Sequence, residues 1–553
     1  MTLTLIIVAA IAVIWFAERS VEHLPLAVAA LCFSAAVLLF AVADFERAIL
    51  LSSILVAAIC GASNVKYNHS GLKLIVTDLP LALAGTIPFL IVQYPLAAIA
   101  VIAGGIALVL AAAAVLFCVP GPPVSLELEV LLFSIAFISL VAAYRASGRA
   151  ASFQRIAAQR QCFFSAFVAS LLNPLSWRQF GGLALSDVAN DPLPLVAAVP
   201  ARTPDYPDII VIQHESIFDP RVYGLPVEPI TDAFLSPKNG LHGSLNVDIF
   251  GGGSWQSEFS LLTGLSSASF GSNAYFLFER GAGRFHSSLP QSLMALGYKA
   301  TFVSSCRRDF LNYDAFYGSI GFGERVFADD FPPPFDVNRF EATNSDALFL
   351  EAALGVHAKS IAGDAAPRFL YALTNFNHGP HTRRLAAPGQ FEGQRAFAAA
   401  SLADAQYAEY YARLAETAAT WNRLRSGLSA SGRPTLIVHY GDHQPVMTRR
   451  IEAKLKLPVD ARRQFRTFYA METLNCRTGR LVSGRGADLD IAFLGTVALQ
   501  QAGLPLDEIF ATRASLLEHC GEAYFASPSE RKRRFHRTLV ELGAIDVTAT
   551  GRF

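Results

Sequence analysis

The fold is decided by the stretch Pro207-Asp-Ile-Ile-Val-Ile-Gln-His-Glu-Ser216, in which four β-branched residues precede a polar ending. A short apolar run of this kind predicts a strand that is buried on both faces, as in a parallel sheet. The stretch Pro434-Thr-Leu-Ile-Val-His-Tyr-Gly-Asp-His-Gln-Pro445 repeats the pattern and ends in Asp442 and His443. Because ligands of parallel sheets bind beyond the carboxyl ends of the strands, both endings are predicted to lie at a site.

From residue 208 onward, strand-like runs alternate with helix-like segments. The expected strands are 209–212, 300–303, 369–373 and 436–438, and the expected helices are 287–296 and 396–424. Alternating β and α elements predict an α/β domain in which helices cover both faces of a mostly parallel sheet.

The first 150 residues are a different kind of sequence. The chain has 553 residues, of which 52% are hydrophobic and only 16% are charged, and its charges are sparse before residue 144. A bilayer crossing takes roughly 20 apolar residues, and the apolar runs that we interpret as spans are 3–17, 24–42, 49–62, 95–118 and 126–144. Segment 80–94 is either re-entrant or a crossing, and segment 162–172 is predicted to lie on the membrane surface.

We predict four parts along the chain. Residues 1–150 form a transmembrane domain of about five helices, 151–204 an interfacial helix and linker, 205–530 the catalytic domain and 531–553 a C-terminal tail. Five spans from a cytoplasmic N-terminus place the catalytic domain outside the cytoplasm.

Four arginines after the last predicted span favour the opposite orientation, because basic residues usually stay in the cytoplasm. They are Arg145, Arg149, Arg155 and Arg160. We keep the extracytoplasmic assignment by placing this segment on anionic headgroups.

Charge and cysteine content exclude some classes of protein. The chain has 45 basic and 45 acidic residues and no basic stripe, so nothing indicates a nucleic-acid partner. Its seven cysteines are scattered without a Cys-x-x-Cys motif, which argues against a disulfide framework or a cysteine metal site.

Glu215, Asp442 and His443 each follow a predicted strand. Two carboxylates and an imidazole suit one divalent metal ion. Taken alone, a glutamate after a strand is usually solvated, and an Asp-His pair is common in loops. The prediction of a metal site therefore rests on the expectation that all three residues lie at the same edge of the sheet. His214 and His439 are expected to be packed or hydrogen-bonded in the core.

Three glycines precede Ser254 in Gly251-Gly252-Gly253-Ser254-Trp255-Gln256-Ser257-Glu258. Glycines allow a sharp turn and a close approach to a ligand, and segment 259–264 has a helical pattern. A hydroxyl at a helix N-terminus can attack an anion, because free N–H groups stabilise developing charge. Alternatively, Ser254 is a helix cap. This segment alone leaves both interpretations open.

Two further polar groups follow predicted strands. Arg308, in Arg307-Arg308-Asp309, can hold phosphate oxygens in pairs, although such runs are usually surface ion pairs. His378, in Asn377-His378-Gly379-Pro380, can bind phosphate or donate a proton to a leaving oxygen.

These motifs resemble the sulfatase-like branch of the alkaline phosphatase superfamily over residues 205–500. Their order is similar to that in the membrane phosphoglycerol transferases, which include lipoteichoic acid synthase and periplasmic glucan-modifying enzymes. The resemblance implies N-terminal transmembrane helices and an alkaline phosphatase-like α/β sandwich with a mostly parallel central sheet.

The resemblance also implies roles for individual residues. Ser254 stands before Glu258-Phe259, where the family has its threonine nucleophile. The implied metal ligands are Glu215, Ser254, Asp442 and His443. The implied phosphate and headgroup contacts are Trp255, Arg308, Asp309 and His378, of which Arg308 and His378 also assist catalysis.

Two departures from the family pattern affect these implications. Cys306 replaces a tryptophan of the synthase, which changes the expected contacts to glycerol. No proline follows Ser254 as the formylglycine motif of true sulfatases requires, which argues against sulfate ester hydrolysis.

We therefore predict a metal-dependent phosphoglycerol transferase of the bacterial inner (cytoplasmic) membrane. It moves glycerophosphate from phosphatidylglycerol, through a covalent Ser254 intermediate, to a hydroxyl of a periplasmic or cell-envelope glycan. The predicted cofactor is Mn²⁺ or Mg²⁺, with Zn²⁺ also permitted, and membrane lipids are partners. The alternatives are a phosphodiesterase or sulfuric ester hydrolase of the superfamily, and a membrane sensor with an inactive enzyme domain.

Overall fold

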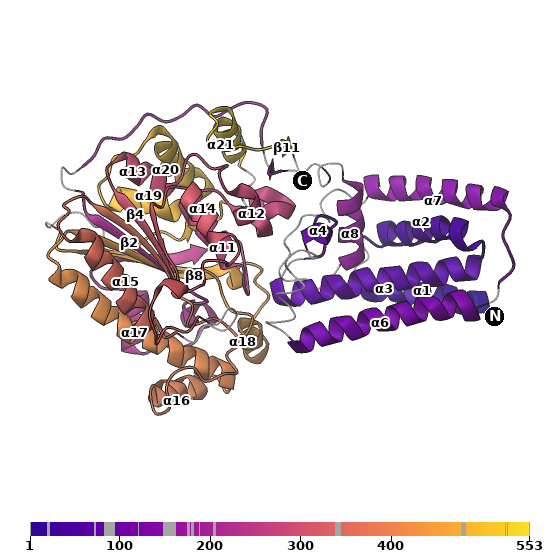
Figure 1. Cartoon of the computed structure of the whole chain (residues 1–553), viewed down its shortest axis with the longest axis horizontal. Coiled ribbons are helices and arrows are strands. Elements are labelled where there is room, and N and C mark those ends of the chain that lie inside the picture. Colours follow the sequence, from indigo (N-terminus) through magenta and orange to yellow (C-terminus); the bar gives the residue numbers. More distant parts are fainter. Residues whose placement is uncertain are drawn as a thin grey trace. The chain divides into compact units, whose positions relative to one another are not determined.

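In a computed structural model, the chain forms two compact units, residues 1–184 and residues 185–552, which are described separately (Figure 1). The residues that the structure describes are 2–18, 23–70, 73–81, 95–119, 121–146, 162–173, 177, 182–186, 188–202, 206–337, 344–476, 483–525, 527 and 529–551.

The first unit is a set of long apolar helices. They are α1 (Thr2–Glu18), α2 (Leu24–Val42), α3 (Phe45–Ser70), α6 (Pro95–Cys118) and α7 (Leu126–Ala146), with short helices α4 (Asp78–Leu81) and α8 (Phe163–Leu172). Among the described residues, four helices are long and apolar enough to cross a membrane, namely α2, α3, α6 and α7. Each predicted span coincides with a helix, and α1, at 17 residues, is shorter than the other four. Most of segment 80–94 lies outside the described residues.

Helix α8, which we predicted to lie on the membrane surface, packs against other helices of the first unit. Phe164, Val168 and Ala169 are buried in one cluster with side chains of α1, α2 and α3. The Glu18 carboxylate accepts hydrogen bonds from the backbone N–H groups of Phe164 (3.1 Å) and Ser165 (2.9 Å) at the start of the helix. This contact from α1 fixes the helix, and a local hydropathy pattern cannot show it.

The second unit is built on a nine-stranded sheet whose main path has the order β10-β3-β8-β7-β2-β6-β4-β5, with β9 paired to β3. The strands are β2 (Asp208–His214), β3 (Leu241–Asn246), β4 (Lys299–Ser304), β5 (Glu324–Val326), β6 (Arg368–Leu373), β7 (Thr435–Gly441), β8 (Arg466–Leu474), β9 (Gly484–Arg485) and β10 (Leu489–Asp490). Strand β8 is antiparallel to β3 and β7, and the other pairs are parallel. The predicted α/β fold with a mostly parallel sheet is confirmed.

Helices cover both faces of this sheet, because its central strands are apolar on both sides (Figure 1). One face carries α10 (Pro229–Leu235), α15 (Asp346–Ile361), α16 (Glu392–Ser401), α17 (Ala405–Ala430) and α18 (Thr448–Leu455), which form one core cluster with alternate residues of β2. The other face carries α11 (Ser254–Thr263), α12 (Leu277–Gly281), α13 (Leu289–Ala295), α14 (Tyr313–Ser319), α19 (Ile491–Gln501), α20 (Glu508–Cys520) and α21 (Glu530–Glu541).

All four predicted strands are present as β2, β4, β6 and β7, and the helix expected at 287–296 is α13. The single helix predicted over 396–424 is wrong, because two helices, α16 and α17, occupy this region. Helix α16 ends before Leu402. The Asp404 carboxylate then caps α17 by accepting from the backbone N–H groups of Gln406 (3.0 Å) and Tyr407 (3.2 Å). Because apolar residues keep their helical spacing from α16 into α17, the sequence pattern does not reveal that the two helices are separate.

The segment that precedes the sheet is fastened to the second unit. Strand β1 (Ala184–Ser186) pairs with β11 (Ala549–Gly551). Residues 188–202, predicted as part of a linker, bond to α21 through Leu193 and Thr538 (2.8 Å), while Val199 and Leu506 form a bridge. Helix α21 itself begins at the boundary of the predicted C-terminal tail. The predicted domain boundaries stay predictions.

Candidate metal centre and nucleophile

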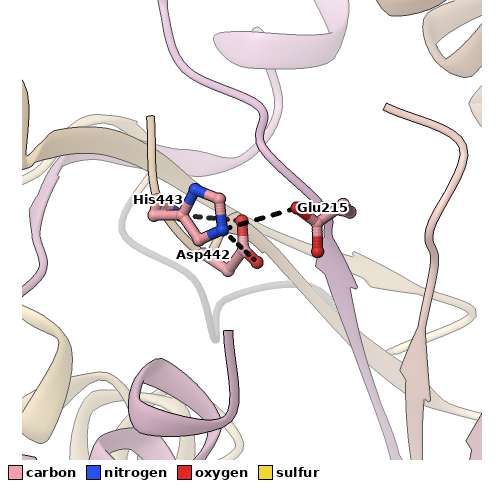
Figure 2. Close-up of side chains that lie close together, drawn as sticks. All are labelled: Glu215, Asp442 and His443. Carbon is pink, nitrogen blue, oxygen red and sulfur yellow. Dashed lines mark hydrogen bonds and ion pairs between the residues drawn. The ribbon is translucent and has the colours of Figure 1, made fainter. Parts of the chain in front are cut away.

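Glu215, Asp442 and His443 meet at the carboxyl ends of two adjacent strands. Glu215 follows β2, the other two follow β7, and the strands are paired in parallel up to His214 and Gly441. One ligand atom from each of the three side chains lies within 4.8 Å of the others (Figure 2). The Nε2 atom of His443 lies 3.4 Å from Glu215 Oε1 and 3.6 Å from Asp442 Oδ2. All three side chains are buried.

The backbone around the cluster is tightly packed. A Cβ atom on Gly441 would lie 1.8 Å from the carbonyl oxygen of Ile217, so only glycine fits before Asp442. Ser216 has a positive φ of 56°, and its N–H donates to Asp442 Oδ1 (2.7 Å) while its hydroxyl donates to Glu215 Oε1 (2.7 Å). Ser216 thus links the two strand ends. Sequence reasoning gave it no role, although it belongs to the Glu215-Ser216 motif.

The His443 ring is oriented as a metal ligand requires. Its Nδ1 lies 3.1 Å from the carbonyl oxygen of Gln444. Because a carbonyl oxygen can only accept, Nδ1 carries the proton, and Nε2 presents a lone pair to the two carboxylates. A hydrogen bond from the other ring nitrogen to a carbonyl is the usual support of a metal-binding histidine.

Asp442 Oδ2 provides a test of whether a cation fits here. This atom is buried and has no hydrogen-bond partner. It faces the unprotonated nitrogen of His443, and a buried acceptor without a donor is costly. A cation among Asp442 Oδ2, His443 Nε2 and Glu215 Oε1 would satisfy these acceptors, so the residues fit a divalent metal.

The electrostatics agree with this interpretation. Burial, and secondarily the Glu215 carboxylate, raises the pKa of Asp442 well above its usual range. Burial lowers the pKa of His443 against the attraction of Glu215, so the imidazole is neutral. Burial raises the pKa of Glu215, but the net shift is downward, because attraction to the His443 and His378 imidazoles when they are protonated and hydrogen bonds from the Ser216 and Ser254 hydroxyls outweigh burial. Without a cation, the two carboxylates compete for protons.

Ser254 joins the cluster from helix α11. Its hydroxyl donates to Glu215 Oε2 (2.9 Å) and lies 3.4 Å from His443 Nε2. Gly253, with φ of 91°, is the N-cap, and the helix has no side-chain cap. The alternative interpretation of Ser254 as a capping serine is therefore wrong. The glycine loop turns the first helical residue toward the metal centre.

Two other residues of α11 matter, and sequence reasoning assigned them no function. The Ser257 hydroxyl donates to the carbonyl of Asp442 (2.7 Å), which ties the helix to the end of β7. Glu258 is fully buried and bonds to Gln213, Tyr313 and Tyr317. Burial raises the pKa of Glu258 to about 8. Apart from the Glu258-Phe259 motif, nothing in the sequence marks these contacts.

His378 lies close enough to influence the cluster. It follows β6, the neighbour of β2, and its imidazole is one of the groups that lower the pKa of Glu215. Its Nδ1 donates to the carbonyl of Gly379 (2.7 Å), which leaves Nε2 available for a substrate.

The remaining predicted contacts are engaged elsewhere. The Arg308 guanidinium pairs with Asp314 (2.9 Å) and Asp330 (2.7 Å), and Asp309 pairs with Arg307 (3.1 Å). The Trp255 indole is buried and donates to the carbonyl of Tyr275 (2.8 Å). The structure thus brings together Glu215, Ser254, Asp442 and His443, with His378 nearby. The roles of Trp255, Arg308 and Asp309 stay predictions.

His214 and His439 are packed residues, as expected. Their buried rings contact Phe234, Trp421 and Phe468. Burial lowers the pKa of His214 to about 3, so the ring is neutral.

Comparisons with known proteins give a family match and distant relatives. Residues 207–466 match the family model described as Sulfatase, a range that contains the four clustered residues. The chain is 25% identical over 310 residues to an uncharacterised protein of Haemophilus influenzae, and the match covers 55% of each protein. The chain thus spans about half the length of this curated relative.

Similar solved structures include two at 15% identity. The phosphoglycerol transferase GacH of Streptococcus pyogenes has a TM-score of 0.46, with 61% of this chain and 85% of that chain covered. The lipoteichoic acid synthase LtaP of Listeria monocytogenes has a TM-score of 0.43, with 55% and 76% covered.

Proposed function

We propose that this protein is a metal-dependent phosphoglycerol transferase of the alkaline phosphatase superfamily, and the match of residues 207–466 to the Sulfatase family model supports this proposal. It takes glycerophosphate from phosphatidylglycerol and passes it to a hydroxyl of a periplasmic or cell-envelope glycan. The observation that carries the proposal is the hydrogen bond from the Ser254 hydroxyl to Glu215, one of three residues that fit a metal ion.

In the first step, Ser254 Oγ attacks the phosphorus of the lipid headgroup. A bond forms between Oγ and phosphorus, and the bond from phosphorus to the diacylglycerol oxygen breaks. Glu215 Oε2 already accepts the hydroxyl proton, so it is placed to receive it. The N-terminus of α11 places backbone N–H groups where the phosphate becomes more negative.

The leaving diacylglycerol oxygen needs a proton, and we assign its delivery to Nε2 of His378, which requires the imidazole to enter this step with protons on both ring nitrogens. In the second step, an acceptor hydroxyl attacks the phosphorus of the glycerophosphoryl group and gives its proton to His378. The bond from phosphorus to Ser254 Oγ breaks, and Glu215 returns the proton to Oγ. A bound Mn²⁺ or Mg²⁺, or alternatively Zn²⁺, held by Glu215, Asp442 and His443, would lower the pKa of the attacking hydroxyl and offset phosphate charge.

Arg308 remains our proposed second phosphate contact. Two of its nitrogens already donate to carboxylates, so phosphate binding uses its remaining N–H groups or displaces Asp314 or Asp330. The apolar helices of the first unit support a lipid donor, because they keep the enzyme in the same membrane as phosphatidylglycerol. We propose that the membrane is the bacterial inner membrane and that the catalytic domain is extracytoplasmic.

Ser254→Ala tests the proposal in the full chain reconstituted with phosphatidylglycerol. We expect release of diacylglycerol to fall by at least about 1,000-fold, because the nucleophile is removed. Ser260→Ala is the control, because Ser260 lies on the same helix but bonds to the carbonyl of Gln256. Unchanged release by Ser254→Ala would refute the covalent mechanism. Product analysis with and without a glycan acceptor separates transfer from hydrolysis.

A further inference from the structure

One face of helix α17 holds the loop that carries His378. Glu409, Arg413 and Thr417 are spaced four residues apart, so they lie on the same side of the helix. All three are buried, and Arg413 is 0% exposed. Each bonds to a different part of residues 376–385, which follow β6.

Arg413 makes the central contacts. Its Nη1 donates to the carbonyl oxygens of His378 (2.9 Å) and Phe376 (3.3 Å), and its Nη2 donates to that of Arg383 (2.7 Å). Its Nε donates to Glu409 Oε1 (3.1 Å). A planar guanidinium holds several acceptors in fixed directions. Arg413 therefore fixes the backbone on both sides of the loop.

The flanking residues complete this arrangement. Glu409 Oε1 also accepts from the backbone N–H of Leu385 (2.9 Å). The Thr417 hydroxyl accepts from the Asn377 side chain (3.0 Å) and donates to Asp346 (2.6 Å). Asn377 is thus held through its side chain, and His378 is held through its backbone carbonyl oxygen.

We propose that Arg413, supported by Glu409 and Thr417, is a positioning residue that holds the His378 imidazole against the substrate phosphate. The proposal rests on the function assigned above. Arg413 is fully buried and bonds to the loop backbone, so it acts on the reaction through His378. It fixes the backbone from which His378 projects, and a misplacement of about 1 Å can cost up to about 100-fold in rate.

Arg395 supplies a matched control. It too is a buried arginine paired with Glu409, through Oε2 at 2.9 Å. Its other bonds go to the carbonyl of Gln390 (3.1 Å) and to Glu392 (2.7 Å). Arg395→Met therefore removes a comparable ion pair without removing the bond to the His378 carbonyl.

The first measurement does not depend on turnover. In the full-length Ser254→Ala protein, the rate at which diethyl pyrocarbonate modifies His378 is followed by mass spectrometry. We expect Arg413→Met to raise this rate several-fold, whereas Arg395→Met leaves it unchanged. Equal rates in both variants would overturn the proposal. Arg413→Lys, which keeps the charge but not the fork, is the second variant in case the methionine protein fails to fold, and the same rise is expected.

The second measurement is a double-mutant cycle on diacylglycerol release. We expect Arg413→Met to lower kcat by about 10- to 100-fold and to cause no further loss in a His378→Ala background. Losses that multiply would show that Arg413 acts independently of His378 and would overturn the proposal. If Ser254→Ala refutes the covalent mechanism, the rates at which diethyl pyrocarbonate modifies His378 still test whether Arg413 holds the His378 loop.

Discussion

Asp442 is the residue at which the need for a cation is clearest. Its Oδ2 atom is buried without a donor and faces the lone pair of His443. Burial raises the pKa of this carboxyl well above its usual range, so a metal ion competes with a proton. Metal binding is therefore expected to strengthen as pH rises, because deprotonation frees the ligand.

This expectation can be measured by titration calorimetry with Mn²⁺ in two buffers of different ionisation enthalpy. We expect proton release on binding at neutral pH, and we expect Asp442→Asn to lower affinity by at least about 100-fold, since the anionic ligand is lost. Chelation of the metal should abolish activity reversibly. Binding without proton release would contradict the assigned state of Asp442.

Glu258 gives a separate pH prediction. Burial raises its pKa in the folded protein to about 8 from the ordinary 4.5. A raised folded pKa means that the stability contribution is complete below about 4.5 and is lost as pH rises through about 8. Each pKa unit corresponds to about 1.4 kcal/mol.

The matching variant is Glu258→Gln, which imitates the protonated carboxyl. We expect its thermal midpoint to depend less on pH between about 4.5 and about 8 than that of the parent protein. Parallel curves for the two proteins would show that Glu258 is ionised throughout this range.

At the scale of elements, Asp404 decides where helix α17 begins. Its carboxylate caps the helix and also pairs with Arg450 (2.9 Å) and Lys454 (3.1 Å) of α18. We expect Asp404→Ala to lower the free energy of unfolding by about 1–2 kcal/mol, because a cap and an ion-pair partner are removed. Asp404→Asn keeps a capping oxygen and should cost less. Denaturant titration distinguishes the two variants, and equal losses would mean that the charge dominates.

The elements also show which parts of the fold could be predicted locally. Strands β2 and β7 were predicted because runs of four and three consecutive apolar residues, 209–212 and 436–438, are rich in β-branched side chains. The break between α16 and α17 was missed, because helical apolar spacing continues across Asp404. Helix α8 was recognised as apolar, but Glu18, which holds its first turn, is distant in the chain.

At the scale of the whole molecule, the orientation of the catalytic domain is the main prediction. Five apolar helices coincide with the predicted spans, and four are long enough to cross a membrane. A reporter fused after residue 176 tests the topology. An alkaline phosphatase reporter should be active and a green fluorescent protein reporter dark, because the former works only outside the cytoplasm and the latter folds inside it. The reverse result would place the domain in the cytoplasm, as the arginines at 145–160 favour.

By itself, the sequence determined the apolar helices, the buried strands and the polar residues that end them, because local apolar patterns reflect burial directly. The tertiary structure decided that Glu215 meets Asp442 and His443, since β2 and β7 are neighbours in parallel register. It also decided that the Ser254 hydroxyl donates to Glu215 and does not cap its own helix, and that Arg413 holds the His378 loop. These contacts join residues far apart in the chain, and their geometry depends on strand order and backbone direction, which no local pattern encodes.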